Sequence, residues 1–131
     1  MNVREKMSLC YSIGSGYYGT KGILVVNAGI DFDKETLVKE EVLRQLALCQ
    51  EGHITDQELR SAKEALLSSL RSTHDSPGSI EGYYSTAALS GLAFSHEGYM
   101  EAVEALTVED VITCARQLQL HTTYFLKGES Q

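Results

Sequence analysis

The chain has 131 residues, enough for one domain with its own core, and its 43% hydrophobic and 22% charged residues are an ordinary globular balance. Its formal net charge of -7 argues against nucleic acid and anionic membranes as partners, because both need a basic face. No apolar run approaches the roughly 18 residues of a membrane span and no signal peptide is visible, so we expect a soluble, cytoplasmic protein.

Two β-strands are predicted near the N-terminus. Residues 9–14 alternate between apolar and small or polar side chains, which is the period of a strand. Residues 23–28 are rich in β-branched side chains and lie between two glycines. The glycine-rich stretch 16–22 between them is expected to be the turn of an antiparallel hairpin.

Two long helices follow the hairpin. Residues 32–51 carry an apolar stripe at helical spacing, and Gly52 is placed to end that helix. The next helix starts at a capping box, in which Thr55 and Glu58 each satisfy a free backbone N–H. We expect Leu59, Ala62, Leu66 and Leu70 to lie on one face of this helix.

Three shorter helices and a last strand complete the prediction. Ser76 and Pro77 are typical of an N-cap followed by proline at the first helical position. A short helix is expected around residues 99–103, and Thr107 with Asp110 repeats the capping box for a fifth helix. Residues 121–126 are predicted to be a closing strand.

The expected order is therefore β-β-α-α-α-α-α-β. Strands at both ends with helices between them predict an α+β fold, in which an antiparallel sheet has helices packed on one face.

The cysteines are not expected to carry chemistry. There are three, and their spacing suggests neither a disulfide framework nor a C-x-x-C site. Cys49 and Cys114 lie on the apolar stripes of predicted helices. We expect both to pack in the core, since a free cysteine behaves as a small hydrophobe.

No metal site is predicted in the chain. No two of the four histidines have the spacing of three or four residues that a helical ligand pair needs. His53 and His74 are expected to be solvated.

The other catalytic patterns are missing too. There is no G-x-S-x-G nucleophile elbow and no glycine fingerprint for phosphate. Glu40 and Glu41 with Arg44 are interpreted as a solvated helix face.

Arg4 and Tyr11 are the two candidate functional residues, and two interpretations remain open. In the first, Tyr11 is a core residue beside Ile13 and Arg4 is a surface charge. In the second, a guanidinium and a phenol project into one groove, where the phenol donates to a developing oxyanion and the guanidinium holds a carbonyl or carboxylate.

The segment 2–13 resembles a stretch in the C-terminal half of insulinase/pitrilysin-type zinc peptidases. Arg4, Lys6, Leu9 and Tyr11 match the R-x-K-x-x-L-x-Y pattern of that stretch. The order of the predicted elements also follows the family over nearly the whole chain.

The resemblance implies a fold, a partner and two residue roles. In this family two similar halves form a clamshell around a peptide, and the N-terminal half carries the zinc-binding H-x-x-E-H sequence. Tyr11 would be a catalytic residue that donates to the oxyanion or substrate carbonyl, and Arg4 with Tyr11 would bind substrate. The zinc is expected in the partner half, with no cofactor in this chain.

Two departures from the family matter. The chain contains no H-x-x-E-H, and the strand and helix that precede the arginine in the family are absent. We therefore expect residues 1–131 to form one incomplete C-terminal domain with an exposed sheet edge, which favours self-association.

The resulting prediction is the substrate-binding, non-zinc-binding part of a zinc metallopeptidase that degrades or processes peptides, inactive alone. The alternative is a non-catalytic, peptidase-like scaffold or peptide-binding module. A third alternative is an unrelated α+β interaction domain, because fold does not fix function.

Overall fold

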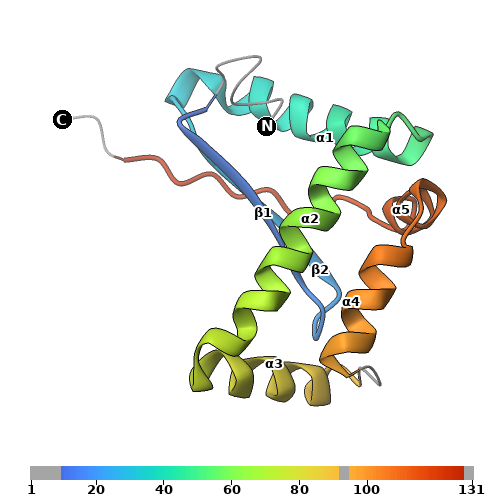
Figure 1. Cartoon of the computed structure of the whole chain (residues 1–131). Coiled ribbons are helices and arrows are strands. Elements are labelled where there is room, and N and C mark those ends of the chain that lie inside the picture. The colour runs from blue at the N-terminus through green and yellow to red at the C-terminus, as the bar shows by residue number, and fades with distance from the viewer. Residues whose placement is uncertain (1–9, 92–94, 129–131) are drawn as a thin grey trace.

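The computed structural model describes residues 10–91 and 95–128. Its N-terminal part is a hairpin of two antiparallel strands, β1 (Ser12–Tyr18) and β2 (Ile23–Gly29). Figure 1 shows this hairpin running through the middle of the molecule with the helices arranged around it.

The first strand of the hairpin extends further along the chain than predicted, and the turn is shorter. Strand β1 continues through Gly14 and Gly16, and the turn occupies only residues 19–22. Gly22 has a φ of 63°, a left-handed conformation that glycine adopts without steric cost. Residues 16–18 of the predicted turn are therefore strand residues, and Gly16 lies opposite Val25 of β2.

The remaining elements are helical. They are η2 (Phe32–Lys34), α1 (Glu35–Glu51), α2 (Asp56–Ser72), η3 (Thr73–Asp75), α3 (Pro77–Leu89), α4 (His96–Ala105) and α5 (Val108–Ala115). No helix among the described residues is long and apolar enough to cross a membrane.

The helix boundaries confirm the capping predictions. Both capping boxes are present, with Thr55 at the start of α2 and Thr107 at the start of α5. The Ser76 side chain caps α3, which begins at Pro77. Gly52 ends α1 with a φ of 85°. Each of these signals is local, since the capping groups lie within three residues of the N–H or carbonyl groups that they satisfy.

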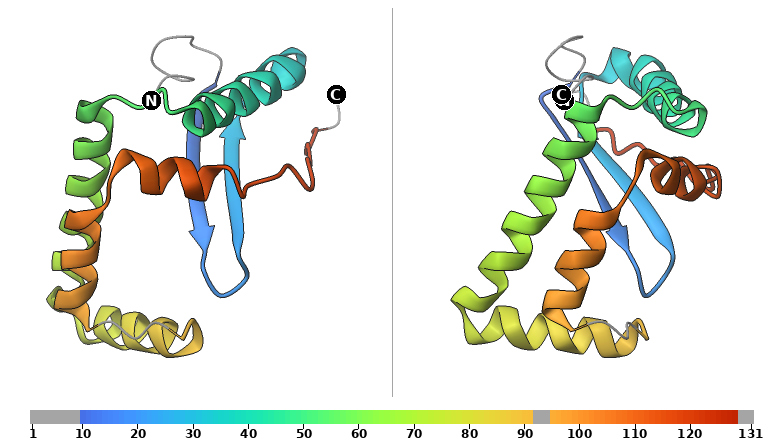
Figure 2. Two further views of the ribbon diagram at one scale, coloured as in Figure 1. Left: turned by 90° about the vertical axis from the view of Figure 1, so that its right-hand side faces the viewer. Right: turned by 45° about the vertical axis from the view of Figure 1, so that its right-hand side comes forward.

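The helices form two groups. Helix α1 covers one end of the hairpin, where buried Val38 packs with Ile13 and Ile30, and α5 lies beside α1. Helices α2 and α4 lie side by side and form an arm, with α3 joined to α2 through η3 at its far end. Figure 2 shows α1 and α5 crossing the same side of the hairpin, while the arm stands away from it.

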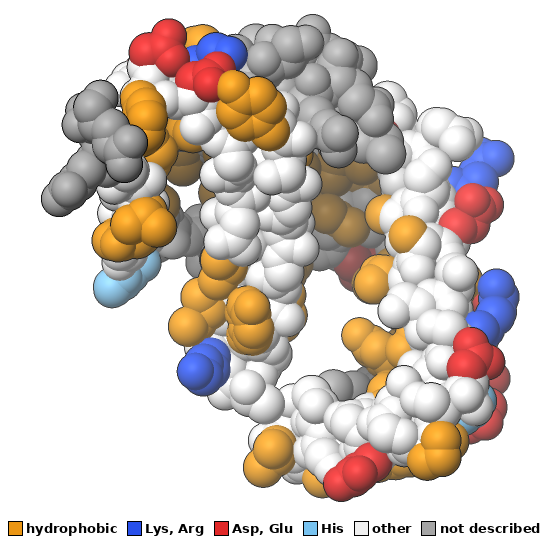
Figure 3. All heavy atoms as spheres, turned by 90° about the vertical axis from the view of Figure 1, so that its left-hand side faces the viewer, with side chains coloured by type: hydrophobic (Ala, Val, Ile, Leu, Met, Phe, Trp, Pro, Cys, Tyr) orange, Lys and Arg blue, Asp and Glu red, His pale blue; other side chains and the backbone are white. Residues whose placement is uncertain are grey.

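The molecule is hollowed between the hairpin and the arm. Figure 3 shows this hollow from the side, with hydrophobic side chains on both of its walls. Helix α3 has no buried residue although its sequence is apolar. The described core is correspondingly small, and its buried hydrophobic residues are Val38, Leu67, Val103, Ile112 and Ala115.

The α+β class and the five predicted α-helices are confirmed, but the closing strand is wrong. Residues 121–126 have no regular secondary structure, and no backbone hydrogen bond involves them within the described part of the chain. Tyr124 and Leu126 are 81% and 76% exposed. A strand needs a neighbouring strand for its N–H and C=O groups, and the two-stranded hairpin does not pair with this segment.

Burial departs from the apolar pattern of two helices, and the prediction that Cys114 packs in the core is wrong. Leu66 is 49% exposed, whereas the next residue, Leu67, is buried. Cys114 is exposed, and Cys49 is half-buried. Helix periodicity gives the width of an apolar stripe, but the neighbouring element decides which residues of the stripe become buried.

Candidate functional site

Tyr11 lies at the N-terminal end of the hairpin. It immediately precedes β1, and its backbone N–H donates to the Gly29 carbonyl at 2.8 Å. Its side chain is 70% exposed, so the interpretation of Tyr11 as a core residue is wrong. Its phenol is accessible to a ligand.

The phenol is held in place by a carboxylate. The Tyr11 O–H donates to the Asp31 carboxylate, and the Lys34 ammonium donates to the same carboxylate at 2.8 Å. We call these three residues the Tyr11 triad. Asp31 follows β2 and Lys34 lies in η2, so the hairpin and the first helical turn together assemble it.

Asp31 and Lys34 were missed by the sequence reasoning. Their spacing of three residues at a helix start was the available signal, because it brings the two side chains together. That Tyr11 also reaches Asp31 depends on the hairpin register, which places residue 12 opposite residue 29.

The triad alters the proton affinity of its members. The hydrogen bond to Asp31, followed by the negative charge of Asp31, raises the pKa of Tyr11. The hydrogen bond from Lys34 and then that from Tyr11 lower the pKa of Asp31. At neutral pH the phenol is therefore a neutral donor, and its one proton points to a charged acceptor.

The Asp31→Asn substitution is expected to lower the pKa of Tyr11 toward the ordinary tyrosine value of about 10, because the charged acceptor is lost. The measurement is an NMR titration with carbon-labelled tyrosine, with Tyr11→Phe assigning the resonance. Asp33→Asn is the matched control, since Asp33 makes the smallest contribution to the Tyr11 shift. An unchanged Tyr11 titration in Asp31→Asn would show that the triad does not form in solution.

Arg4 lies outside the described residues, as do Lys6 and Leu9 of the same pattern. Its pairing with Tyr11 in one groove stays a prediction.

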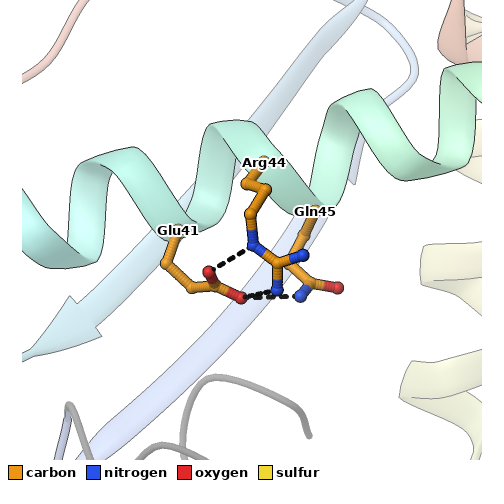
Figure 4. A network of polar contacts seen from close by, with 3 residues as sticks. All are labelled: Glu41, Arg44 and Gln45. Atoms are coloured by element: carbon orange, nitrogen blue, oxygen red, sulfur yellow. Dashed lines mark hydrogen bonds and ion pairs between the residues drawn. The ribbon is translucent and has the colours of Figure 1, made fainter.

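A second polar network lies on α1, where Glu40 and Arg44 are exposed as predicted but Glu41 is buried. Glu41 is only 5% exposed and accepts bonds of 2.7 Å from Nε and Nη2 of Arg44 and from Nε2 of Gln45 (Figure 4). These bonds, that of Arg44 first, lower the pKa of Glu41. The hydrogen-bond donors to Glu41 among the described residues come from its own helix, so we assign Glu41 a structural role.

The histidines form no metal site within the described ranges, where no group of three or more His, Cys, Asp or Glu residues is suited to hold a metal ion. His53 is exposed beside Glu51, whereas His96 is buried and its Nε2 lies 2.8 Å from the Leu70 carbonyl. The imidazole of His74 lies 4.3 Å from that of His96 between ring centroids. His96 thus connects α4 to the end of α2.

Comparison with known proteins gives one family and several relatives. The model of the peptidase M16 inactive domain matches residues 1–66, about half of the chain. A "Probable inactive metalloprotease YmfF" of Bacillus subtilis (strain 168) is 29% identical over 128 residues. That match covers 98% of this chain but only 30% of the relative.

Two solved structures share the fold. A conserved protein from Enterococcus faecalis V583 has a TM-score of 0.79 and 24% identity, covering 89% of this chain and 28% of the other. A protease from Helicobacter pylori has a TM-score of 0.72 and 18% identity, covering 88% of this chain and 29% of the other. The chain therefore spans less than a third of the length of each of these relatives.

Proposed function

Since this chain belongs to the family of the peptidase M16 inactive domain, we propose that it is the substrate-binding, non-zinc-binding part of a zinc metallopeptidase and is inactive alone. The family match confirms the resemblance of residues 2–13 to the C-terminal half of such peptidases. The peptide substrate and the zinc-bearing half remain part of the proposal.

The observation that carries the proposal is the exposed phenol of Tyr11 at the start of an exposed strand. A two-stranded sheet leaves the outer edge of each strand without a strand neighbour among the described residues. Such an edge binds an extended peptide through main-chain hydrogen bonds. A peptide lying along β1 would pass the Tyr11 phenol.

The Tyr11 triad favours a charged acceptor over a neutral one. Hydrogen bonds to a charged acceptor are roughly twice as strong as neutral ones, so a neutral substrate carbonyl competes poorly with Asp31. A developing oxyanion is itself charged and competes much better. Tyr11 would thus donate more strongly in the transition state than in the ground state, which is what accelerates a reaction.

In this proposal the zinc ion is bound by a partner half and not by this chain. The family model describes an inactive domain, and the described residues provide no cluster of metal ligands. The partner half with H-x-x-E-H would hold the ion, which would polarise a water molecule there. The residues of this chain would bind and orient the peptide.

A second candidate function is a non-catalytic, peptidase-like scaffold or peptide-binding module. The relative described as a probable inactive metalloprotease favours this second function. The hydrogen bond from the Tyr11 hydroxyl to Asp31 favours it too, because that bond uses the one proton that Tyr11 could donate to a substrate. In a scaffold the triad would serve only to fix the start of the hairpin against η2.

One experiment separates the two candidates. The native assembly that contains this chain is purified by pull-down, its proteins are identified by mass spectrometry, and its zinc content is measured. Zinc near one equivalent together with an H-x-x-E-H sequence supports the peptidase. A metal-free assembly without that sequence supports the scaffold.

A further inference from the structure

The Asp31 carboxylate does not perform the local task that its position suggests. Asp31 is the N-cap residue of η2, where an aspartate side chain usually accepts from a backbone N–H of the first helical turn. Its side chain makes no such bond among the described residues. Its two oxygens instead accept from the Tyr11 hydroxyl and from the Lys34 ammonium, one oxygen from each. Each oxygen of the carboxylate therefore has a donor from within the Tyr11 triad.

Backbone hydrogen bonds fix both sides of this contact. The Tyr11 N–H donates to the Gly29 carbonyl at 2.8 Å, which holds residue 11 beside the end of β2. The Lys34 N–H donates to the Asp31 carbonyl at 3.1 Å, which holds the start of η2. The hairpin register and the first helical turn thus bring the phenol to the carboxylate before any side chain is ordered.

The triad has two opposite effects on the Tyr11 proton. The hydrogen bond to Asp31, followed by the charge of Asp31, raises the pKa of Tyr11. The charge of Lys34 lowers the pKa of Tyr11, since the ammonium partly neutralises the carboxylate that holds the phenol. Asp31 therefore opposes donation of the hydroxyl to any other acceptor, and Lys34 weakens that opposition.

We propose that Asp31 restrains the Tyr11 hydroxyl as an autoinhibitory contact and that Lys34 moderates this restraint. The inference rests on the proposed function, in which Tyr11 donates to the oxyanion of a peptide. To do so the phenol turns from Asp31 to the substrate, while its proton stays on the phenol oxygen and Lys34 stays on the carboxylate. Breaking the bond to Asp31 adds to the barrier, because it is broken only when the transition state forms. Asp31 acts through Tyr11 and is a positioning residue.

Asp31→Asn is expected to raise kcat/KM of the proposed zinc-bearing assembly by about three- to tenfold. Asparagine keeps the shape of the side chain but offers a neutral oxygen, to which a hydrogen bond is about half as strong as to a charged one. Asp31 is 40% exposed, so solvent screening keeps the gain modest. Asp33→Asn is the matched control, since it makes the same change within η2 and should alter kcat/KM by less than about twofold.

Lys34→Met is expected to act in the opposite direction. Without the ammonium the full charge of Asp31 acts on the phenol, so kcat/KM should fall by about two- to fivefold. The same substitution in the 131-residue chain alone should raise the pKa of Tyr11, because Lys34 lowers it. An NMR titration with carbon-labelled tyrosine measures that change and needs no peptidase activity.

The double variant of Tyr11→Phe with Asp31→Asn tests whether the gain passes through the phenol. Without the Tyr11 hydroxyl Asp31 has nothing to restrain, so the double variant should be as slow as Tyr11→Phe alone. A gain that persists in the double variant would come from the freed Lys34 ammonium and would overturn the proposal. So would a folded Asp31→Asn assembly without a gain, or a Lys34→Met chain in which the Tyr11 titration is unchanged.

These outcomes differ from a failure of the proposed function. If Tyr11→Phe alone leaves kcat unchanged, Tyr11 has no part in the reaction and the restraint has no catalytic consequence. If Tyr11→Phe slows the reaction but Asp31→Asn does not accelerate it, only the restraint is overturned. Circular dichroism checks the fold of each variant, and if Asp31→Asn does not fold, the two Lys34→Met measurements decide.

Discussion

Replacing Tyr11 with phenylalanine in the proposed zinc-bearing assembly is expected to lower kcat for peptide hydrolysis by about 100- to 1,000-fold. The range is that of losing one donor to an oxyanion. KM should change little, since a donor that acts mainly in the transition state contributes little to ground-state binding. Steady-state kinetics on a peptide substrate measure both constants.

Tyr18→Phe is the matched control for this experiment. Tyr18 is 57% exposed at the end of β1, the strand that follows Tyr11, and the Tyr11 triad does not include it. An unchanged kcat in Tyr11→Phe would remove Tyr11 from the mechanism. Equal losses in both variants would instead indicate damage to the hairpin rather than loss of a specific donor.

The second large effect is on stability. Leu67→Ala is expected to lower the free energy of unfolding by about 2–4 kcal/mol, because it leaves a cavity in a small core. Leu67 is 8% exposed and lies on α2, which packs against α4. Urea denaturation followed by circular dichroism at one fixed protein concentration measures the change.

Leu66→Ala is the matched control, because it makes the same chemical change one residue earlier on the same helix. Leu66 is 49% exposed, so its substitution should cost less than about 1 kcal/mol. Equal losses for the two leucines would mean that the face assigned to α2 is wrong. The comparison also tests whether the arm is held by the α2–α4 contact.

The sequence predicted well wherever a signal is local. The capping boxes at Thr55 and Thr107, the Ser76–Pro77 start and the Gly52 end all agree with the structure. In each case the residues that interact lie within a few positions of one another. Their geometry therefore follows from the helix itself and needs no partner.

Predictions that depend on contacts with distant segments of the chain were less accurate. The pattern of residues 121–126 is that of a strand, but a strand forms only where another edge accepts its hydrogen bonds. Glu41 was expected in solvent and is buried against Arg44. Cys114 was expected in the core and is exposed. Each outcome depends on what lies beside the residue in space.

The candidate site divides in the same way. The spacing pattern in residues 4–11 was enough to single out Tyr11 and to predict the family. The comparison with known proteins confirmed the family. The exposure of Tyr11 and its hydrogen bond to Asp31 could not be predicted in this way. They depend on the hairpin register, which brings together residues 20 positions apart.

By itself, then, the sequence determined the family, the α+β class and the helix boundaries, because family patterns and helix caps are set by residues close along the chain. Only the tertiary structure decided which leucine of α2 is buried, where the Tyr11 proton points and which apolar surfaces stay open. These depend on contacts between distant segments, whose free energies exist only once the elements have been brought together.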